Sequence, residues 1–287
     1  MKSFPIGVML ESFRLPIEEA LGKARDLKVQ GIQVYATTGE LAPDRLSAAQ
    51  RKEFLKKVRD HGLVVSAVCG DLGHGFGDAQ KNPGLVESSK RILDLSLEWE
   101  SGIVTTHIGV IPDEPDSPMY RAMQAACRDL GFYAAGKGVS LAVETGPETA
   151  AALRLFLDRL EAPGVGVNLD PANLVMVTGD DPVAAVRTLA PYLVHTHAKD
   201  GRQLQPCDRH EVYGAFAEGG FAQLEARMGR LFQETPLGEG AVDWPRYLAA
   251  LTAAGYRGFL TIEREVGVDP EGDIRKAVAF LRRTMDG

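Results

Sequence analysis

The sequence predicts a single (β/α)8 barrel, an α/β fold in which eight parallel strands alternate with eight helices. Short runs of β-branched residues alternate with longer amphipathic segments along the whole chain. Eight such strand–helix pairs fit into 287 residues, slightly more than the ~250 residues typical of this fold. No stretch rich in Pro, Gly and Ser divides the chain. We therefore expect one domain over residues 1–287.

The expected strands are short and rich in β-branched residues: 6–10, 31–35, 64–69, 103–108, 139–144, 165–170, 193–198 and 259–263. The expected helices have apolar residues at helical spacing: 16–29, 47–61, 83–100, 117–137, 147–160, 182–189, 244–254 and 269–283. Asp181 and Asp243 stand where an N-cap residue accepts backbone hydrogen bonds. Gly62, Gly138 and Gly255 follow helices, where a left-handed C-cap favours glycine.

One segment, residues 201–240, is too long for an ordinary loop between the seventh strand and the seventh helix. Five apolar residues within it follow helical spacing: Phe221, Leu224, Met228, Leu231 and Phe232. We therefore expect an insertion that contains an extra helix. This helix either packs on the barrel, covers the site as a lid, or forms a contact between two copies of the chain.

Composition and charge disfavour several classes of protein. A net charge of −7 argues against a surface that follows nucleic-acid phosphates. Cys69, Cys127 and Cys207 are an odd number without a CxxC pair, so neither a disulfide framework nor a cysteine zinc site is expected. No apolar run reaches the ~18 residues of a membrane span, and the first residues lack the pattern of a signal peptide. These features predict a cytoplasmic protein without nucleic-acid or membrane partners.

Polar side chains gather on one face of the later strands. Since side chains alternate along a strand, Glu144, Asp170, His197 and Glu263 end the polar faces of the fifth to eighth expected strands. His107 holds a similar position on the fourth strand. The apolar faces are expected to meet the helices, and the polar faces to line the barrel interior. These ionisable groups then lie at the C-terminal ends of the strands, where barrel enzymes build their active sites.

Glu144, Asp170, His197 and Glu263 together predict a metal site. One carboxylate at a strand end is more often a helix cap or a surface ion pair, and one interior histidine is more often part of a hydrogen-bonded core. Three converging carboxylates, however, would repel each other unless they were protonated or neutralised by a cation. We expect one divalent ion. Oxygen-rich ligands with one imidazole favour Mn²⁺, with Mg²⁺, Co²⁺ and Zn²⁺ as alternatives.

Five motifs surround these residues in order: LAVETG at 141–146, VNLDPANL at 167–174, VHTHAKD at 194–200, PLGEG at 236–240 followed by VDWP at 242–245, and AGYRGFLTIE at 254–263. In these motifs the chain resembles the xylose isomerase-like superfamily of sugar isomerases and epimerases. That superfamily shares its barrel with the endonuclease IV type of DNA repair nuclease. The resemblance implies that Glu144, Asp170, His197 and Glu263 bind one divalent cation, and that Glu144 and Glu263 also transfer protons in the epimerase branch.

The chain departs from two branches of the superfamily. Asn173 stands where the ketose 3-epimerases have a histidine that contacts substrate, so the resemblance does not define the substrate. The trinuclear-zinc nucleases use the same histidine and a later Asp-x-His pair, whereas only His210 follows His197 here. With the negative net charge, this difference disfavours a nuclease. His74, in the motif DLGHGFG at 71–77, is expected to be a polar residue of the sugar pocket rather than the remnant of a zinc ligand.

These observations predict a metal-dependent isomerase or epimerase of a sugar or sugar phosphate, which transfers a proton through an enediolate of a ketose-like substrate. His107, His74, Asn173 and Lys199 are expected to bind substrate, although Lys199 is alternatively an ion-pair partner of Asp170 or Asp200. Dehydration of a cyclic polyol such as an inosose needs the same metal and base. A nuclease and a non-catalytic sugar-binding protein are the weaker alternatives. The expected partner is a small carbohydrate, and a homo-oligomer is left open.

Overall fold

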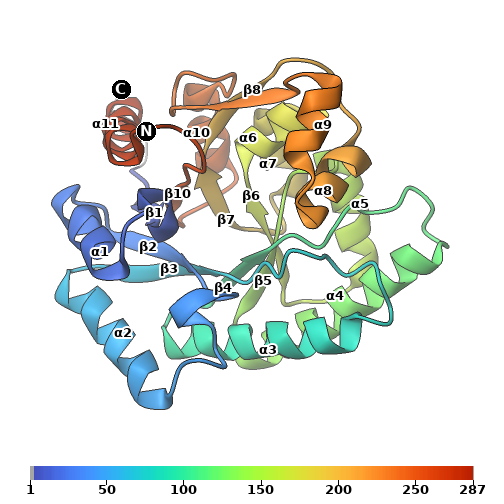
Figure 1. Cartoon of the computed structure of the whole chain (residues 1–287), viewed down its shortest axis with the longest axis horizontal. Coiled ribbons are helices and arrows are strands. Elements are labelled where there is room, and N and C mark those ends of the chain that lie inside the picture. Colours follow the sequence, from blue (N-terminus) through green and yellow to red (C-terminus); the bar gives the residue numbers. More distant parts are fainter. Residues whose placement is uncertain (1–2, 287) are drawn as a thin grey trace.

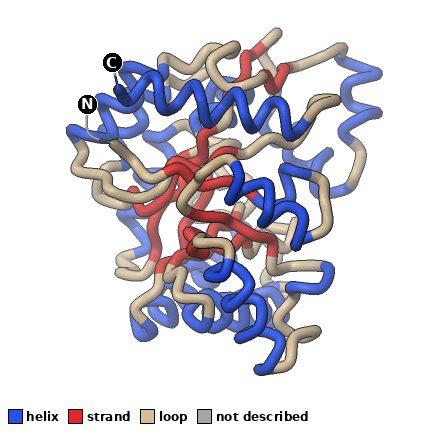
Figure 2. Tube along the Cα trace, turned by 90° about the vertical axis from the view of Figure 1, so that its left-hand side faces the viewer, coloured by secondary structure: helices blue, strands red, loops and turns tan. Residues whose placement is uncertain are grey.

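The computed structural model describes residues 3–286 and confirms the predicted barrel. Eight strands close in the order β1-β10-β7-β6-β5-β4-β3-β2, with helices around them (Figures 1 and 2). Each pairing of neighbouring barrel strands is parallel. The barrel strands are β1 (Ile6–Met9), β2 (Gly31–Tyr35), β3 (Val64–Cys69), β4 (Ile103–Thr106), β5 (Ser140–Glu144), β6 (Val165–Leu169), β7 (Leu193–Ala198) and β10 (Leu260–Ile262).

The outer ring consists of α1 (Ile17–Asp26), α2 (Ala48–Asp60), α3 (Asn82–Glu98), α4 (Pro118–Lys137), α5 (Ala150–Leu160), α7 (Pro182–Leu189), α10 (Trp244–Ala253) and α11 (Pro270–Asp286). Their ends follow the capping residues in the sequence. The Asp181 side chain accepts from the Val183 amide, and Gly138 ends α4 with a φ of 71°. None of the helices within residues 3–286 is long and apolar enough to cross a membrane.

Two differences from the predicted boundaries concern loops at the mouth of the barrel, where the candidate site lies. The fourth strand ends at Thr106 rather than at residue 108, because the Ile108 carbonyl accepts from the Phe76 amide in the loop after β3. The fifth helix begins at Ala150 rather than at residue 147, because Thr149 is its N-cap and accepts from the Ala152 amide. The residues between β5 and α5 therefore form a loop at the mouth of the barrel.

A polar layer fills part of the barrel interior and confirms the predicted alternation of strand faces. The Gln33 side chain donates to Thr105 Oγ1 at 3.0 Å, and its Oε1 lies 3.0 Å from His195 Nε2. These three side chains are at most 1% exposed. On the opposite face of β7, Thr196 Oγ1 lies 2.6 Å from the Tyr247 hydroxyl of α10. The interior layer thus supports the strand ends that carry the candidate site.

The insertion between β7 and α10 contains more than the one extra helix expected. It comprises β8 (Asp200–Gln203), α8 (Arg209–Glu218), α9 (Phe221–Met228) and β9 (Phe232–Thr235), and β8 pairs antiparallel with β9. The helical spacing predicted through Leu231 and Phe232 was wrong: Gly229 follows α9 with a φ of 80°, and Phe232 begins β9. Figure 1 shows these elements together at one end of the barrel, beside α6 (Pro171–Asn173).

Asp200 fixes the insertion to the barrel. Its carboxylate accepts hydrogen bonds from the Gly238 amide at 2.9 Å, the Val242 amide at 3.2 Å and the Trp244 indole at 2.9 Å. The side chain is 1% exposed. Because one buried carboxylate joins β8 to the start of α10, the chain that leaves the barrel at β7 returns close to its point of departure.

Candidate metal centre

The structure brings the ends of four strands together in one buried group. Glu144 is the last residue of β5, Asp170 follows β6, His197 lies near the end of β7 and Glu263 follows β10. One ligand atom from each residue lies within 4.8 Å of the others. The four side chains are at most 7% exposed. Since β10, β7, β6 and β5 are successive strands of the barrel, the polar faces read from the sequence converge on one point.

His197 lies at the middle of this group. Its Nδ1 is 3.3 Å from Asp170 Oδ2, 3.4 Å from Glu263 Oε2 and 3.6 Å from Glu144 Oε1. Burial opposes a charge on the ring, but the carboxylates of Glu263 and Glu144 outweigh it and raise the pKa of His197 well above its usual range. Without a bound cation, a proton on His197 thus offsets part of the negative charge of the three carboxylates.

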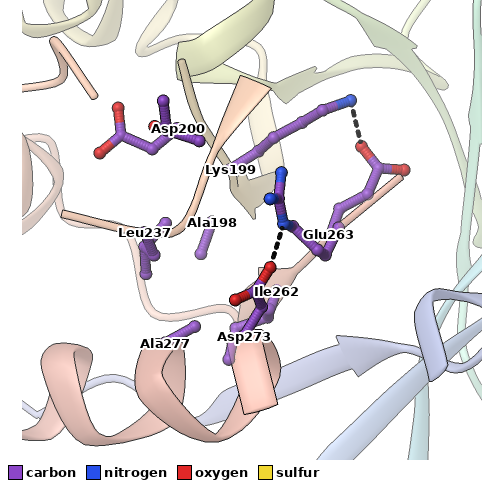
Figure 3. A pocket seen from close by; sticks show the side chains of 10 residues that line it. Ala198, Lys199, Asp200, Leu237, Ile262, Glu263, Asp273 and Ala277 are labelled. Atoms are coloured by element: carbon purple, nitrogen blue, oxygen red, sulfur yellow. Dashed lines mark hydrogen bonds and ion pairs between the residues drawn. The ribbon is translucent and has the colours of Figure 1, made fainter. Parts of the chain in front are cut away.

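Glu263 also contacts a buried lysine. Lys199 Nζ lies 3.0 Å from Glu263 Oε2 and also pairs with Glu265. Burial disfavours the Glu263 carboxylate, but Lys199 and His197 overcome this effect and lower its pKa below the usual range. Figure 3 shows the Lys199 side chain extended toward Glu263, with Asp200 pointing away from both. The alternative partners considered for Lys199, Asp170 and Asp200, are therefore not the ones that it contacts.

Glu144 accepts hydrogen bonds from two side-chain amides. Asn168 Nδ2 donates to Glu144 Oε2 at 3.1 Å, and Asn173 Nδ2 donates to Glu144 Oε1 at 3.1 Å. The backbone amide of Asn173 donates to Asp170 Oδ1 at 2.8 Å. These bonds orient two of the carboxylates without neutralising them. Asn173, predicted from the sequence to bind substrate, thus lies against the acids of the centre.

The donor set fits a divalent metal ion. Three buried carboxylates face each other, and Lys199 contacts only one of them. Ionised carboxylates in such a place are stable only when cations or protons offset their charge. Three carboxylate oxygens and one imidazole nitrogen suit Mn²⁺ or Mg²⁺, and four protein ligands leave coordination positions for substrate oxygens.

Gln33 is a supporting residue that the sequence analysis did not single out. Its Oε1 lies 3.2 Å from His197 Nε2, so that a proton on Nε2 leaves Nδ1 free to face the acids. Gln33 is the one long polar side chain in the otherwise small or apolar β2 segment GIQVY, apart from its terminal tyrosine. That exception was the available signal. A metal-binding histidine commonly uses its second nitrogen in this way.

Of the other predicted site residues, His107 approaches the centre and His74 does not join its network. His107 Nδ1 lies 2.9 Å from Asp71 Oδ2, and its Nε2 lies 3.8 Å from Glu144 Oε1. Burial opposes protonation, but Glu144 and Asp71 raise the pKa of His107 to about 9. His74 is exposed in the loop after β3. None of the hydrogen bonds and ion pairs that join the described site residues involves it.

The insertion contributes to the mouth of the barrel through α8, which the sequence analysis missed. The Tyr213 ring centroid lies 5.7 Å from that of His107. A Cβ atom at Gly146, in the loop after β5, would lie 1.9 Å from the Tyr213 hydroxyl oxygen. Arg209, at the start of α8, pairs with Asp113 in the loop after β4. The insertion therefore lies across the strand ends that carry the centre.

Two curated proteins illustrate the similarity in sequence. The uncharacterised protein YfiH of Bacillus subtilis is 30% identical over 313 aligned positions, which cover 94% of this chain and 96% of that protein. An inosose dehydratase of Lacticaseibacillus casei is 26% identical over 145 positions, which cover 50% of this chain and 45% of that protein. The second match thus concerns about half of each chain.

Solved structures extend the similarity to the whole fold. A xylose isomerase domain protein of Planctomyces limnophilus has a TM-score of 0.77 and 27% identity, covering 98% of this chain and 96% of its own. A D-psicose 3-epimerase, solved in the presence of D-fructose, has a TM-score of 0.72 and 17% identity, covering 99% and 100%. A xylose isomerase-like barrel of Mycobacterium smegmatis in complex with magnesium has a TM-score of 0.72 and 20% identity, covering 99% and 98%.

The family assignment rests on nearly the whole chain. The model of the family described as xylose isomerase-like TIM barrel matches residues 21–284. That range contains all four residues of the candidate metal centre and the whole insertion. With the closed eight-stranded barrel and the full-length similarity to YfiH, it follows that this chain belongs to the xylose isomerase-like TIM barrel family.

Proposed function

We propose that the chain is a divalent-metal-dependent isomerase or epimerase that moves a proton next to the carbonyl group of a ketose-like carbohydrate. The observation that carries this proposal is the presence of two glutamates, Glu144 and Glu263, in one buried group around His197. Their strands, β5 and β10, are separated in the barrel by β6 and β7. A substrate bound at the centre would therefore meet a carboxylate from each side.

Glu144, Asp170, His197 and Glu263 would hold the ion, for which Mn²⁺ is the first candidate. The bound ion would polarise the substrate carbonyl and stabilise the negative charge that develops when a neighbouring C–H proton leaves. The solved barrel in complex with magnesium supports a divalent ion in a protein of this fold. Gln33 and Asn168 would keep His197 and Glu144 in place.

The two glutamates are suited to proton transfer because their surroundings differ. Glu263 is kept ionised by Lys199 and can accept a proton. Glu144 accepts hydrogen bonds from the side-chain amides of Asn168 and Asn173 and can return a proton to the opposite face of the same carbon, which inverts that centre. In the reverse direction the roles exchange. Return of the proton to the neighbouring carbon gives aldose–ketose isomerisation instead.

Dehydration of a cyclic polyol is the second candidate, favoured by the similarity to inosose dehydratases. Asn173 supports it further, because the ketose 3-epimerases carry a histidine at that position. The two reactions share the metal and the first proton removal and differ in whether a hydroxyl group then leaves. One glutamate would be sufficient as the base for dehydration.

The test is incubation of the Mn²⁺-loaded protein in D₂O with a panel of ketoses and inososes, followed by NMR and mass analysis of the products. An epimerase or isomerase yields an isomer of the substrate in which a hydrogen on carbon has been replaced by deuterium. A dehydratase yields a product that lacks one water. Glu263→Gln is the control for contaminating activity. If the loaded protein neither incorporates deuterium into any of these compounds nor changes one of them, the proposed function is wrong.

A further inference from the structure

Glu148 is a buried carboxyl group outside the four-residue centre. It lies in the loop between β5 and α5 and is 1% exposed. Within residues 3–286, no hydrogen-bond donor reaches either of its carboxylate oxygens, although the Ile111 amide faces the group from outside hydrogen-bonding geometry. A buried polar group left in this way destabilises the fold. A ligand that completes its hydrogen bonds would remove that cost.

The charged and titratable groups that act on Glu148 come from the mouth of the barrel. Arg209 of α8 and His107 after β4 favour its ionised form, but burial outweighs them and raises the pKa of Glu148 to about 8. Burial and then Glu144 and Glu148 raise the pKa of Tyr213 of α8. Glu148 therefore belongs to the region between the metal centre and the insertion, and it carries a proton at neutral pH.

A second polar group of this region is also left without a partner. His107 Nε2 is buried and accepts or donates no hydrogen bond to another described residue, while Nδ1 of the same ring contacts Asp71. Its nearest acid on that side is Glu144, at 3.8 Å. His107 and Glu148 interact electrostatically. Two unpartnered groups thus occur in the loops that follow the adjoining strands β4 and β5.

The cationic side chains around the centre are already paired with acids. Lys199 pairs with Glu263 and Glu265, His107 with Asp71, and Arg209 with Asp113. A phosphate or carboxylate group of a substrate would meet cations whose charge these acids already offset. It would also face the buried acids of the centre. An uncharged hydroxyl group needs no free cation and is not repelled by these acids.

We propose that Glu148 forms a subsite for a hydroxyl group of an uncharged carbohydrate, and that the site discriminates against phosphorylated and carboxylated substrates. A protonated carboxyl group can donate one hydrogen bond and accept another, which matches a hydroxyl group. The inference takes the location of the site from the proposed function, but it holds for epimerisation and dehydration alike. Of the two substrate classes predicted from the sequence, sugars and sugar phosphates, the proposal keeps only the uncharged sugars.

Binding of paired charged and uncharged probes to the Mn²⁺-loaded protein tests whether the site discriminates between substrates by their charge. Isothermal titration calorimetry compares D-fructose with fructose 6-phosphate, and myo-inositol with shikimate, a carboxylated ring. We expect the uncharged member of each pair to bind at least about tenfold more tightly, a difference of ~1.4 kcal/mol. Tighter binding of either charged member, or no binding of any probe, overturns the proposal. Loss of that binding in Arg209→Gln would then assign the anion to α8.

Two substitutions test Glu148 itself. Glu148→Gln keeps the shape and both hydrogen-bonding functions, so we expect its affinity for the uncharged probe to stay within about threefold of the unsubstituted protein. Glu148→Leu removes both functions and should lose at least about tenfold in affinity while its Tm rises, because an unpartnered buried carboxyl has been removed. A merely structural role predicts no loss of affinity in a more stable protein. Unchanged affinity in Glu148→Leu contradicts the proposal.

The proposal and the proposed function can fail separately. Selective binding of the uncharged probes without any deuterium incorporation would leave the subsite in place and remove the catalytic assignment. Deuterium incorporation into a sugar phosphate, with tight binding of the charged probe, would support the catalytic assignment and overturn the subsite.

Discussion

At the scale of single residues, His195 and His197 lie two positions apart on one face of β7 but have opposite tendencies to take up a proton. Burial lowers the pKa of His195 to about 3, and its Nε2 lies 3.0 Å from Gln33 Oε1. His197 faces three carboxylates, which raise its pKa. The sequence places both histidines on one face and His197 nearer the end of the strand, where the acids lie.

This difference predicts separate effects of removing each ring. His197→Ala should lower Mn²⁺ affinity by at least about tenfold, because one of the four proposed ligands is lost. His195→Ala should leave the metal content unchanged and lower the free energy of unfolding by about 1 to 3 kcal/mol, because Gln33 loses a partner and a cavity forms. Metal analysis and urea unfolding of both variants measure these effects. Equal metal loss in both variants would contradict the assignment of His197, rather than His195, to the metal centre at the end of β7.

The paired acids predict a loss of catalysis without loss of the fold. Glu144→Gln and Glu263→Gln keep the shape of the side chain but cannot exchange a proton, so turnover should fall by at least about a hundredfold. Excess Mn²⁺ must be present, since both residues are also proposed ligands, and metal binding is measured in the same samples. A dehydratase with a single base would lose deuterium exchange in only one variant. Retained turnover in both metal-loaded variants would remove both glutamates from the mechanism.

Glu148 predicts a dependence of stability on pH. Its pKa is raised from 4.5 to about 8 in the folded protein, so the folded chain keeps a proton that the unfolded chain releases between these values. Stability therefore falls as pH rises through this window, by up to ~1.4 kcal/mol per unit of pKa difference. Glu148→Gln should be about as stable as the unsubstituted protein near pH 4.5 and more stable by a few kcal/mol at pH 8.5.

Urea unfolding of metal-free protein at pH 4.5, 6.5 and 8.5 measures this effect. Glu161→Gln is a suitable control for the substitution itself, because the Glu161 side chain is 78% exposed. A stability gain in Glu148→Gln that is the same at all three pH values would show that Glu148 is ionised in the folded protein.

At the scale of elements, the barrel strands were predictable because each carries its own pattern. The strands expected at 31–35, 64–69 and 193–198 have those bounds in the structure. The pairing of β8 with β9 was not predictable. Asp200 and Thr235 are partners in that pairing, yet 35 positions separate them, and β8 has the polar sequence DGRQ. Local periodicity contains no information on such a contact.

The residues of the candidate site also divide into those that a local pattern predicts and those that only the fold brings together. Glu144, Asp170, His197 and Glu263 were found from strand parity, since a strand end reports its own position in a barrel. Glu148 and Tyr213 lie in a loop and in the insertion, where no periodic pattern indicates which side chains meet. Their closeness to the centre depends on how α8 folds back over the loop after β5.

The contact between Gly146 and Tyr213 predicts how α8 is held. A Cβ atom at Gly146 would lie 1.9 Å from the Tyr213 hydroxyl oxygen, so Gly146→Ala should displace α8 and speed amide hydrogen exchange in residues 209–218. The effect should nearly vanish when Tyr213 is already alanine, with a coupling of about 0.5 to 3 kcal/mol. Gly136→Ala in α4 is the matched control, because nothing lies within 4 Å of its added Cβ. If exchange in the double variant is faster than in Tyr213→Ala alone, the Gly146→Ala effect has another cause than the contact with Tyr213.

At the scale of the whole molecule, the fold alone does not determine the reaction. Structures that share it bear the names of an epimerase and of a probable 3-DHS dehydratase, so the activity depends on the side chains at the mouth. In this chain those side chains join successive strands of the barrel. Glu144, Asp170, His197 and Glu263 belong to half of its eight strands, and repulsion among their carboxylates acts across that half.

An ion that neutralises this repulsion should stabilise the whole barrel. At a hundredfold excess over its dissociation constant, a ligand that binds only the folded state adds ~2.7 kcal/mol, which corresponds to a rise in Tm of about 5 to 10 °C for a chain of this size. We expect Mn²⁺ to produce such a rise, and elemental analysis to find about one ion per chain. Asp170→Asn, which keeps the shape but removes the charge of one proposed ligand, should reduce the rise. If Mn²⁺, Mg²⁺, Co²⁺ and Zn²⁺ all leave the Tm of metal-free protein unchanged, the four residues are not a metal site, and their mutual charge must be offset by protons alone.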